Sequence, residues 1–236
     1  MDQSVERAVV DVAVEPVEIR GRRGAWITTA SAVADERAYE AQFDALDDAL
    51  GNLGMDPADA VRSRLTAATR PGRDAGSLVR LRRQALPFRT VTSSYIDRSR
   101  FAGSDGAIVE TLALDGARVD KLAREHAPSP PPWRVVATGD LVFFSGITSF
   151  ARALDDQLVE MASLIDRAMR LADALTGRTA RSVAAATYVQ RDLEADAVAD
   201  LGARLGLDGV PLRVARCDGF SFPSKLVEVE IDAVLG

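Results

Sequence analysis

Hydrophobic and polar side chains alternate in several short stretches of the chain, a period typical of β-strands with one buried face. The last such stretch, LVEVEIDAVL, carries the carboxylates Glu228, Glu230 and Asp232 between apolar residues. On a strand these carboxylates share one face, each about 7 Å from the next. Two interpretations follow, since like charges repel and burial is costly. Either this face is exposed to solvent, or one carboxylate faces a cleft and acts there.

Stretches with helical periodicity separate the strands and repeat in the same order in both halves. For the first half the pattern predicts strands near 9–20 and 25–33, a helix over 36–52, a strand over 60–69, a helix over 75–84, and strands over 87–96 and 107–114. For the second half it predicts a hairpin over 133–148, a helix over 154–175, a strand over 182–190, a helix over 193–205, and strands over 211–217 and 225–235. Both halves read ββαβαββ, so we expect an α+β protein with two related domains. Each is predicted to be a mixed β-sheet with two helices on one face.

Two short motifs strengthen the case for a duplication. The motif PFR, which ends at Arg89, corresponds to PLR, which ends at Arg213. Likewise, Glu110 corresponds to Glu230. The two halves should therefore superpose with Arg89 over Arg213. The resulting division is a divergent domain over 1–120, a proline-rich, semi-rigid linker over 121–132 and a second domain over 133–236.

Composition narrows the classes of function. The 236 residues have a formal net charge of −6 and a mean hydropathy near zero, as in an ordinary globular protein. An acidic chain without a basic stripe argues against nucleic-acid binding. No apolar run approaches the ~20 residues that span a bilayer, and the N-terminus lacks the apolar core of a signal peptide. We therefore expect a cytoplasmic protein with no membrane contact.

The chain has a single histidine, His126, and a single cysteine, Cys217. This scarcity argues against a Ser–His–Asp triad, a Cys–His pair, an internal disulfide and a multi-histidine metal centre. The glycines also lack the spacing of a phosphate-binding loop. We expect neither metal nor cofactor. Any catalysis would depend on carboxylates, arginines, hydroxyls, backbone amides and water.

The order GDLVFFSG, helix, strand, helix, P-x-R and a strand reading VEIDAV resembles the Rid (YjgF/YER057c/UK114) family. The resemblance is clearest from Trp133 to Leu235 and weaker in the first half, where PFR and IVETLAL carry it. It implies a chorismate-mutase-like α+β fold and a homotrimer with ligand sites in clefts between neighbouring domains. It also implies hydrolysis of reactive enamines and imines to ketoacids and ammonia.

By this resemblance Arg213 clamps a substrate carboxylate through two parallel N–H donors. Glu230 faces the cleft and moves a proton, which requires a raised pKa, whereas Glu228 and Asp232 lie toward the rim or bulk water. An ordinary surface or inter-domain salt bridge is the alternative for Arg213. The remaining substrate-binding candidates are Trp133, Ser145, Gly146, Phe222, Arg89 and Glu110.

Some residues depart from the family pattern. Trp133 stands where the family commonly has tyrosine, Ile147 replaces a polar residue, and Ser31 stands where the first half should have its glycine. The loop over 218–225 is longer than expected, and its Phe220 and Phe222 either form a lid over the site or pack within a hairpin. Two interpretations of the first-half site, with Arg89 and Glu110, stay open: it is structural, or it binds a ligand without reacting.

The leading hypothesis is a Rid-like enzyme that acts on a carboxylated imine, enamine or related reactive intermediate. The step is hydrolytic deamination or a tailoring reaction in a specialised biosynthetic pathway, and the partner is a small carboxylate. Two alternatives stay open. One is a chorismatase-like enzyme, because chorismatases also pair a divergent first domain with a Rid-like second one. The other is a non-catalytic metabolite-binding or interaction protein.

Overall fold

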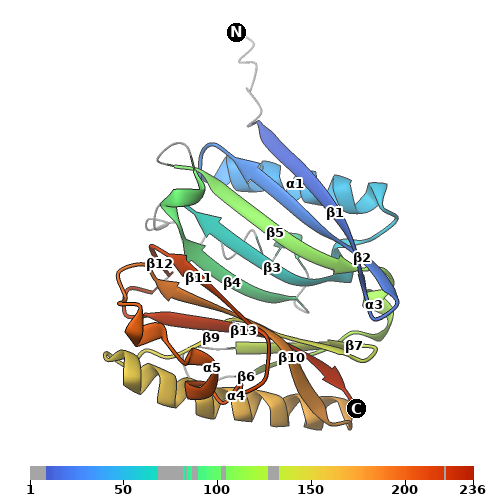
Figure 1. Cartoon of the computed structure of the whole chain (residues 1–236). Helices are drawn as coiled ribbons and strands as arrows, with labels where there is room; N and C mark the ends of the chain where they lie inside the picture. Colours follow the sequence, from blue (N-terminus) through green and yellow to red (C-terminus); the bar gives the residue numbers. More distant parts are fainter. Residues whose placement is uncertain are drawn as a thin grey trace.

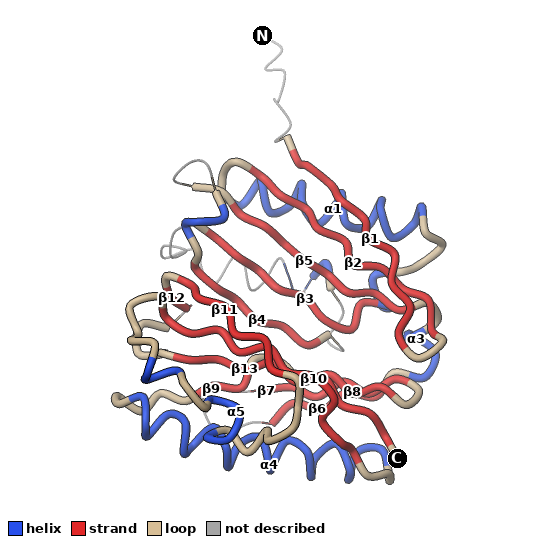
Figure 2. Tube along the Cα trace, in the orientation of Figure 1, coloured by secondary structure: helices blue, strands red, loops and turns tan. Residues whose placement is uncertain are grey.

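Two mixed β-sheets pack against each other, and a long helix covers the outer face of each (Figures 1 and 2). The computed structural model describes residues 9–68, 82, 84–86, 90–101, 105–126, 133–220 and 222–236. No helix within these ranges is long and apolar enough to cross a membrane.

The first sheet has the strand order β1-β2-β5-β3-β4-β12. Its strands are β1 Val10–Ile19, β2 Arg22–Ser31, β3 Ala60–Ala67, β4 Val91–Ile96, β5 Ala107–Leu114 and β12 Gly219–Phe220. Helix α1, Glu36–Asn52, begins where predicted because the Asp35 carboxylate accepts a hydrogen bond from the backbone N–H of Ala38 at 2.8 Å. Its apolar stripe, including Phe43 and Leu50, packs on the outer face of this sheet.

The second sheet has the order β11-β10-β13-β8-β7-β6, and β9 pairs with β13. Its strands are β6 Leu122–His126, β7 Trp133–Thr138, β8 Leu141–Phe144, β9 Ile147–Thr148, β10 Ala180–Gln190, β11 Leu212–Cys217 and β13 Val227–Leu235. Helix α4, Leu154–Thr176, covers its outer face and ends at Gly177, whose left-handed backbone (φ 68°) favours glycine. The short helices are η1 Pro57–Asp59, η2 Arg98–Arg100, α3 Ala117–Asp120, η3 Asp196–Val198 and α5 Leu201–Arg204.

Besides the core under each long helix, a third apolar core lies between the sheets. It joins residues of the first half, such as Val61 and Leu114, to residues of the second half, such as Val136 and Phe143. The inner face of each sheet is therefore covered by the other sheet within the same chain. Burial of apolar area here stabilises the contact between the halves.

One further strand lies at the edge of each sheet, and it belongs to the other half of the chain or directly follows it. Strand β6 follows the first half in sequence but pairs with β7, with Leu122 opposite Ala137. Strand β12 belongs to the second half but pairs with β4, with Phe220 opposite Tyr95. These exchanges make the two sheets parts of one folded unit rather than separate domains joined only by a linker.

The α+β prediction with its repeated strand order is confirmed, with local corrections. The predicted helix over 193–205 is wrong, because the chain enters the left-handed region at Asp200 (φ 55°), which a continuous α-helix excludes. The predicted helix over 75–84 lies almost wholly outside the described residues. Residues 122–126, assigned to the linker, form β6, and 127–132 lie outside the described residues. The domain boundaries themselves stay a prediction.

Candidate functional site

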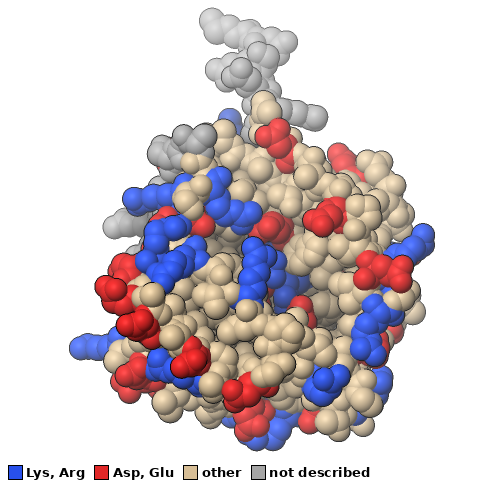
Figure 3. Space-filling view, in the orientation of Figure 1, with Lys and Arg blue, Asp and Glu red and all other residues tan. Residues whose placement is uncertain are grey.

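A cavity of about 230 Å³ opens between the two sheets, and both halves line it. The first half contributes Arg64, Thr66, Tyr95, Asp97, Arg100 and Glu110. The second half contributes Tyr188, Ala215, Cys217, Arg213 and Arg216. Figure 3 shows basic side chains gathered on this face of the molecule, over the region of β12 and the end of β4.

Strand register explains how distant residues reach the cavity. In the second sheet Ala186 lies opposite both Glu230 and Arg213, so these three form one row across β13, β10 and β11. Residues directly opposite each other point to the same face of a sheet. Glu230 and Arg213 are thus two strand spacings apart, about 10 Å, with only the small side chain of Ala186 between them.

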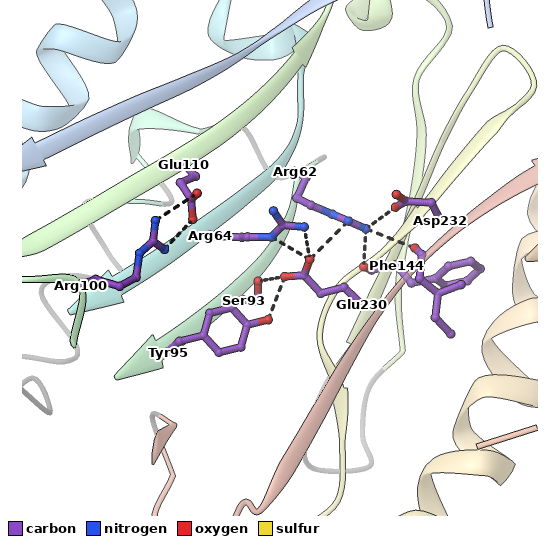
Figure 4. A network of polar contacts seen from close by, with 10 residues as sticks. Arg62, Arg64, Ser93, Tyr95, Arg100, Glu110, Phe144, Glu230 and Asp232 are labelled. Carbon is purple, nitrogen blue, oxygen red and sulfur yellow. Dashed lines mark hydrogen bonds and ion pairs between the residues drawn. The ribbon is translucent and has the colours of Figure 1, made fainter. Parts of the chain in front are cut away.

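Glu230 is the centre of a buried polar network between the sheets (Figure 4). Its Oε2 accepts hydrogen bonds from Arg64 Nε at 2.8 Å and Nη2 at 2.6 Å. Arg62 Nη1 lies 3.3 Å from the same oxygen. Its Oε1 accepts hydrogen bonds from the Tyr95 hydroxyl at 2.8 Å and from the Ser93 hydroxyl. Four side chains of the first sheet thus hold one carboxylate of the second.

This network fixes the charge state of Glu230. Burial alone would raise the pKa of Glu230, but the Arg62 and Arg64 guanidinium groups, with hydrogen bonds from Arg64 and Ser93, outweigh it and lower the pKa to about 2. The predicted raised pKa is therefore wrong, because sequence reasoning did not include these two arginines. Glu230 is an ionised anchor rather than a group that exchanges protons near neutral pH.

The two arginines that bind Glu230 have different surroundings. Arg62 is nearly inaccessible and also contacts Asp232 Oδ1 at 2.7 Å and the carbonyl oxygens of Phe144 and Ile231, each at 3.2 Å. Arg64 lines the cavity, and its guanidinium lies 4.8 Å from the centre of the Trp26 ring. Burial disfavours its charge, but Glu230 outweighs burial and raises the pKa of Arg64. Arg64 is a fixed cation on the cavity wall.

Arg213 is exposed and lines the same cavity, and it has no hydrogen bond or ion pair to any residue that the structure describes. Its neighbours in the lining are already engaged. Arg100 Nη1 lies 3.2 Å from Glu110 Oε2, and Arg216 donates to the carbonyl oxygens of Arg191 and Leu193 at 2.9 and 2.7 Å. The guanidinium of Arg213 is therefore available to a ligand.

Two stacked tyrosines form another part of the wall. The ring centres of Tyr95 and Tyr188 are 3.8 Å apart and their planes differ by 19°, while Phe220 meets Tyr95 edge-on at 6.0 Å. Burial raises the pKa of Tyr95 well above its usual value, and Glu230 adds to this effect. Both rings come from inner sheet faces, so the stack spans the two halves.

Glu228 does not lie at the rim as predicted; its carboxylate is buried and pairs with Lys225 Nζ at 3.1 Å. Burial raises the pKa of Glu228, although Lys225 opposes the shift. The prediction is wrong because the other sheet, rather than water, covers this face of β13. The Asp232 side chain keeps 39% of its accessible surface, so it lies nearer to the rim, as predicted.

No protein-family model matches the chain, and no curated protein matches it. A crystal structure of a chorismatase matches with a TM-score of 0.61 and 16% identity, over 94% of this chain and 80% of that chain. Its fold consists of two Rid-like halves in tandem. The present chain has a tandem Rid-like fold.

Two other structures each match about half of the chain. A YjgF/YER057c/UK114 family member from Mycobacterium tuberculosis has 23% identity over 42% of this chain and 83% of that chain, with a TM-score of 0.36. A YjgF family protein from Neisseria meningitidis has 20% identity over 48% of this chain and 94% of that chain, with a TM-score of 0.33. Our fold assignment rests on the chorismatase match, and at these identities likeness concerns the fold alone.

Within this Rid-like fold, five predicted site residues are not among those that line the cavity: Glu230, which lies in the buried network, and four others. Trp133 is buried in the core under α4. The Ser145 hydroxyl accepts a hydrogen bond from the backbone N–H of Arg134 at 2.7 Å. Gly146 lies against Glu228, whose Oε1 would be 1.9 Å from a β-carbon there. Phe222 is half exposed and packs on Phe150, with ring centres 5.1 Å apart.

Phe220, in the loop after β11, does not form a lid over the cavity. That residue is wholly buried in β12 and packs against Tyr95, which agrees with the packing interpretation. Neither Phe220 nor Phe222 is among the residues that line the cavity.

The strand register also revises the equivalence of the two halves. In the first sheet Arg64 lies opposite Glu110 and Ser93, just as Ala186 lies opposite Glu230 and Arg213 in the second. If Glu110 corresponds to Glu230, then Ser93 corresponds to Arg213. The register therefore disagrees with the predicted superposition of Arg89 on Arg213. Arg89 itself lies outside the described residues.

Sequence reasoning missed Arg62, Arg64, Tyr95 and Tyr188. A signal existed for the arginines, because RSRL places Arg62 and Arg64 on one face of a strand with strongly apolar neighbours. Such a pair requires carboxylate partners when it is buried, and the last strand carries them. Among the described residues no group of three or more histidine, cysteine, aspartate or glutamate side chains could hold a metal ion.

Proposed function

We propose that this chain is a Rid-like enzyme that binds a small carboxylated metabolite in the cavity between its two sheets. The supporting observation is the unpaired guanidinium of Arg213 on the cavity wall. Arginine presents two parallel N–H donors that match a carboxylate. A volume of about 230 Å³ lies below the ~300–1,000 Å³ of typical drug-sized sites, which favours a small ligand.

The charge of the lining supports an anionic ligand. Four arginines and two carboxylates line the cavity, which leaves an excess of two positive charges. Arg64 and Arg100 are held by Glu230 and Glu110, so their positions are set before a ligand arrives. Preorganised cations attract a carboxylate without a further cost of ordering.

The reaction is hydrolysis of a carboxylated imine or of the enamine that tautomerises to it. Water adds to the imine carbon, the C–N bond breaks, and a 2-oxo acid and ammonia leave. The imine carbon is already electrophilic, so orientation beside Arg213 supplies much of what catalysis needs. Glu230 contributes by holding Arg64 and Tyr95 in place. A related tailoring step in a specialised biosynthetic pathway would use the same binding mode.

A chorismatase-like reaction is the second candidate. The match to the chorismatase structure extends over 94% of this chain and includes both halves. A substrate with more than one carboxylate also suits a cavity with surplus positive charge. A protein that binds the metabolite without converting it is the third possibility, and it differs from the other two only in turnover.

The test supplies 2-iminobutanoate and 2-aminoacrylate, generated in situ by an added amino-acid dehydratase, and follows ammonia release. Chorismate is offered separately and its consumption is followed by absorbance. Arg213→Ala should abolish activity, whereas Arg181→Ala, which removes an exposed arginine of β10 outside the cavity, should keep it. Turnover of chorismate alone would favour the second candidate. Binding without turnover of any substrate would reject the enzyme proposal.

We also propose a homotrimer in the cytoplasm, as the family resemblance and the composition predicted. A sheet with helices on one side only would leave its other face to be covered by threefold packing, but here each inner face is covered within the chain. Support for the trimer is therefore limited to the resemblance. Light scattering at micromolar concentration should report three times the mass of the 25.2 kDa chain. A mass near that of one chain would reject the trimer.

A further inference from the structure

Tyr188 lies beside the free arginine on the inner face of the second sheet. Its strand, β10, places it opposite Ala215 of β11, one row from the pair formed by Ala186 and Arg213. Tyr188 and Arg213 are thus diagonal neighbours across two strands, with Cβ atoms about 7–8 Å apart, a distance that long side chains bridge. Both residues line the cavity.

The ring of Tyr188 is held in one orientation. It stacks on Tyr95 at 3.8 Å between ring centres. Tyr95 is itself fixed, because its hydroxyl donates to Glu230 and Phe220 packs against its edge. A phenol supported in this way presents its hydroxyl with little freedom, which suits recognition of one atom of a ligand.

The two hydroxyl groups of the stack differ in one respect. That of Tyr95 is engaged with Glu230, whereas that of Tyr188 has no hydrogen-bond partner among the described residues. The Tyr188 hydroxyl is also absent from the buried polar atoms that lack a partner, so it is accessible from the cavity. A polar group that is half-buried, oriented and unpaired beside an unpaired guanidinium indicates a ligand contact.

Electrostatics determines which role this hydroxyl can take. Burial and, after it, Glu230 raise the pKa of Tyr188 to about 12, although Arg64 and Arg213 oppose the shift. At neutral pH the phenol therefore keeps its proton and can donate it in a hydrogen bond. The acceptor on a ligand would be a carbonyl oxygen or an imine nitrogen.

We infer that the Tyr188 hydroxyl donates a hydrogen bond to the oxygen or nitrogen on the carbon next to the carboxylate held by Arg213. This assignment rests on the proposed function, since it needs a carboxylate on Arg213. It makes Tyr188 a specificity residue, because a plain carboxylic acid leaves its hydroxyl without a partner. The cavity thus distinguishes 2-oxo and 2-imino acids from acids that lack this group.

The experiment compares the dissociation constants of 2-oxobutanoate and butanoate by titration calorimetry. The wild-type protein should bind 2-oxobutanoate more tightly, and Tyr188→Phe should reduce that preference by about two- to tenfold, the range of one hydrogen bond. Phenylalanine preserves the stack on Tyr95. Tyr39→Phe is the matched control, because Tyr39 belongs to α1 and packs in the core on the outer face of the first sheet, away from the cavity. It should keep the wild-type preference.

The outcomes separate this assignment from the proposed function. If the wild type binds both acids and Tyr188→Phe keeps the full preference, Tyr188 does not select the ligand and the proposed function stands. If the wild type binds neither acid, the proposed function fails and the assignment fails with it. A thermal midpoint of Tyr188→Phe close to the wild-type value would show that a lost preference comes from the hydroxyl and not from unfolding.

Discussion

The two sheets carry corresponding rows of three residues, and the rows differ in the strand that holds the arginine. The rows are Glu230, Ala186 and Arg213 in the second sheet, and Glu110, Arg64 and Ser93 in the first. In the row of the second sheet the arginine, Arg213, stands on β11 and has no ion pair or hydrogen bond within the described residues. In the row of the first sheet the arginine, Arg64, stands on β3 and binds Glu230 of the other sheet (Figure 4).

This difference separates two roles of arginine: one anchors a buried carboxylate, and the other stays available to a ligand. A buried carboxylate needs a partner, and Glu230 is 1% exposed, so both Arg62 and Arg64 are committed to it. Glu110 is less buried and forms its ion pair with Arg100. One arginine row therefore holds the halves together, and the other leaves a cation free for a ligand.

The largest effect should follow loss of Arg62. Arg62→Met leaves Asp232 without its ion pair and weakens the hold on buried Glu230, so we expect a loss of about 3–5 kcal/mol in the free energy of unfolding. Arg170→Met is the control, because the Arg170–Asp166 pair is 64% exposed on both sides and should cost under about 1 kcal/mol. Denaturant unfolding measures both. Equal, small losses would contradict the anchoring role assigned to Arg62.

Acid should weaken the contact between the halves through Glu230. Its pKa falls from an ordinary 4.5 to about 2 in the folded chain, so the unfolded state binds the proton more readily. The resulting stability, roughly 3 kcal/mol, is present above pH 4.5 and is lost as the pH falls toward 2. Glu230→Gln lacks this titration. The gap in unfolding free energy between wild type and variant should therefore shrink across that range, and a constant gap would contradict the assigned ionisation.

The free arginine should affect binding without affecting stability. Arg213→Ala and Arg213→Lys should each weaken carboxylate binding by about tenfold or more, because lysine keeps the charge but loses the paired donors. Both variants should unfold at the wild-type denaturant concentration, since Arg213 has no ion pair or hydrogen bond within the described residues. Calorimetric titration and denaturation measure the two quantities. A lysine variant that binds as well as the wild type would mean that only charge matters there.

The smallest effect should come from Glu110. Its ion pair with Arg100 keeps 23% and 39% of the two side-chain surfaces accessible, so Glu110→Gln should cost under about 1 kcal/mol of unfolding free energy. Glu230→Gln should cost several times more above pH 4.5, because that carboxylate is buried and multiply bonded. Urea denaturation of the two variants side by side is the measurement. Similar losses would mean that the two carboxylates contribute equally to the free energy of unfolding.

Local pattern was enough to predict most of the elements. Alternation identified β5 and β13 almost to the residue, and helix α1 was predicted with its observed bounds from its helical periodicity. The same alternation placed the three carboxylates of β13 on one face, and P-x-R pointed to Arg213. These features depend on neighbours in the chain, which sequence shows directly.

Only the tertiary structure decided what those carboxylates face. Arg64 and Glu230 are 166 residues apart, so no local pattern pairs them. The exchange of β6 and β12 likewise depends on how the two sheets meet. A strand face is exposed or buried according to what packs on it, and a carboxylate gains or loses its proton according to the charges brought beside it. Sequence therefore determined the strands and their polar face, and the packing of one half on the other made Glu230 an anchor and left Arg213 free.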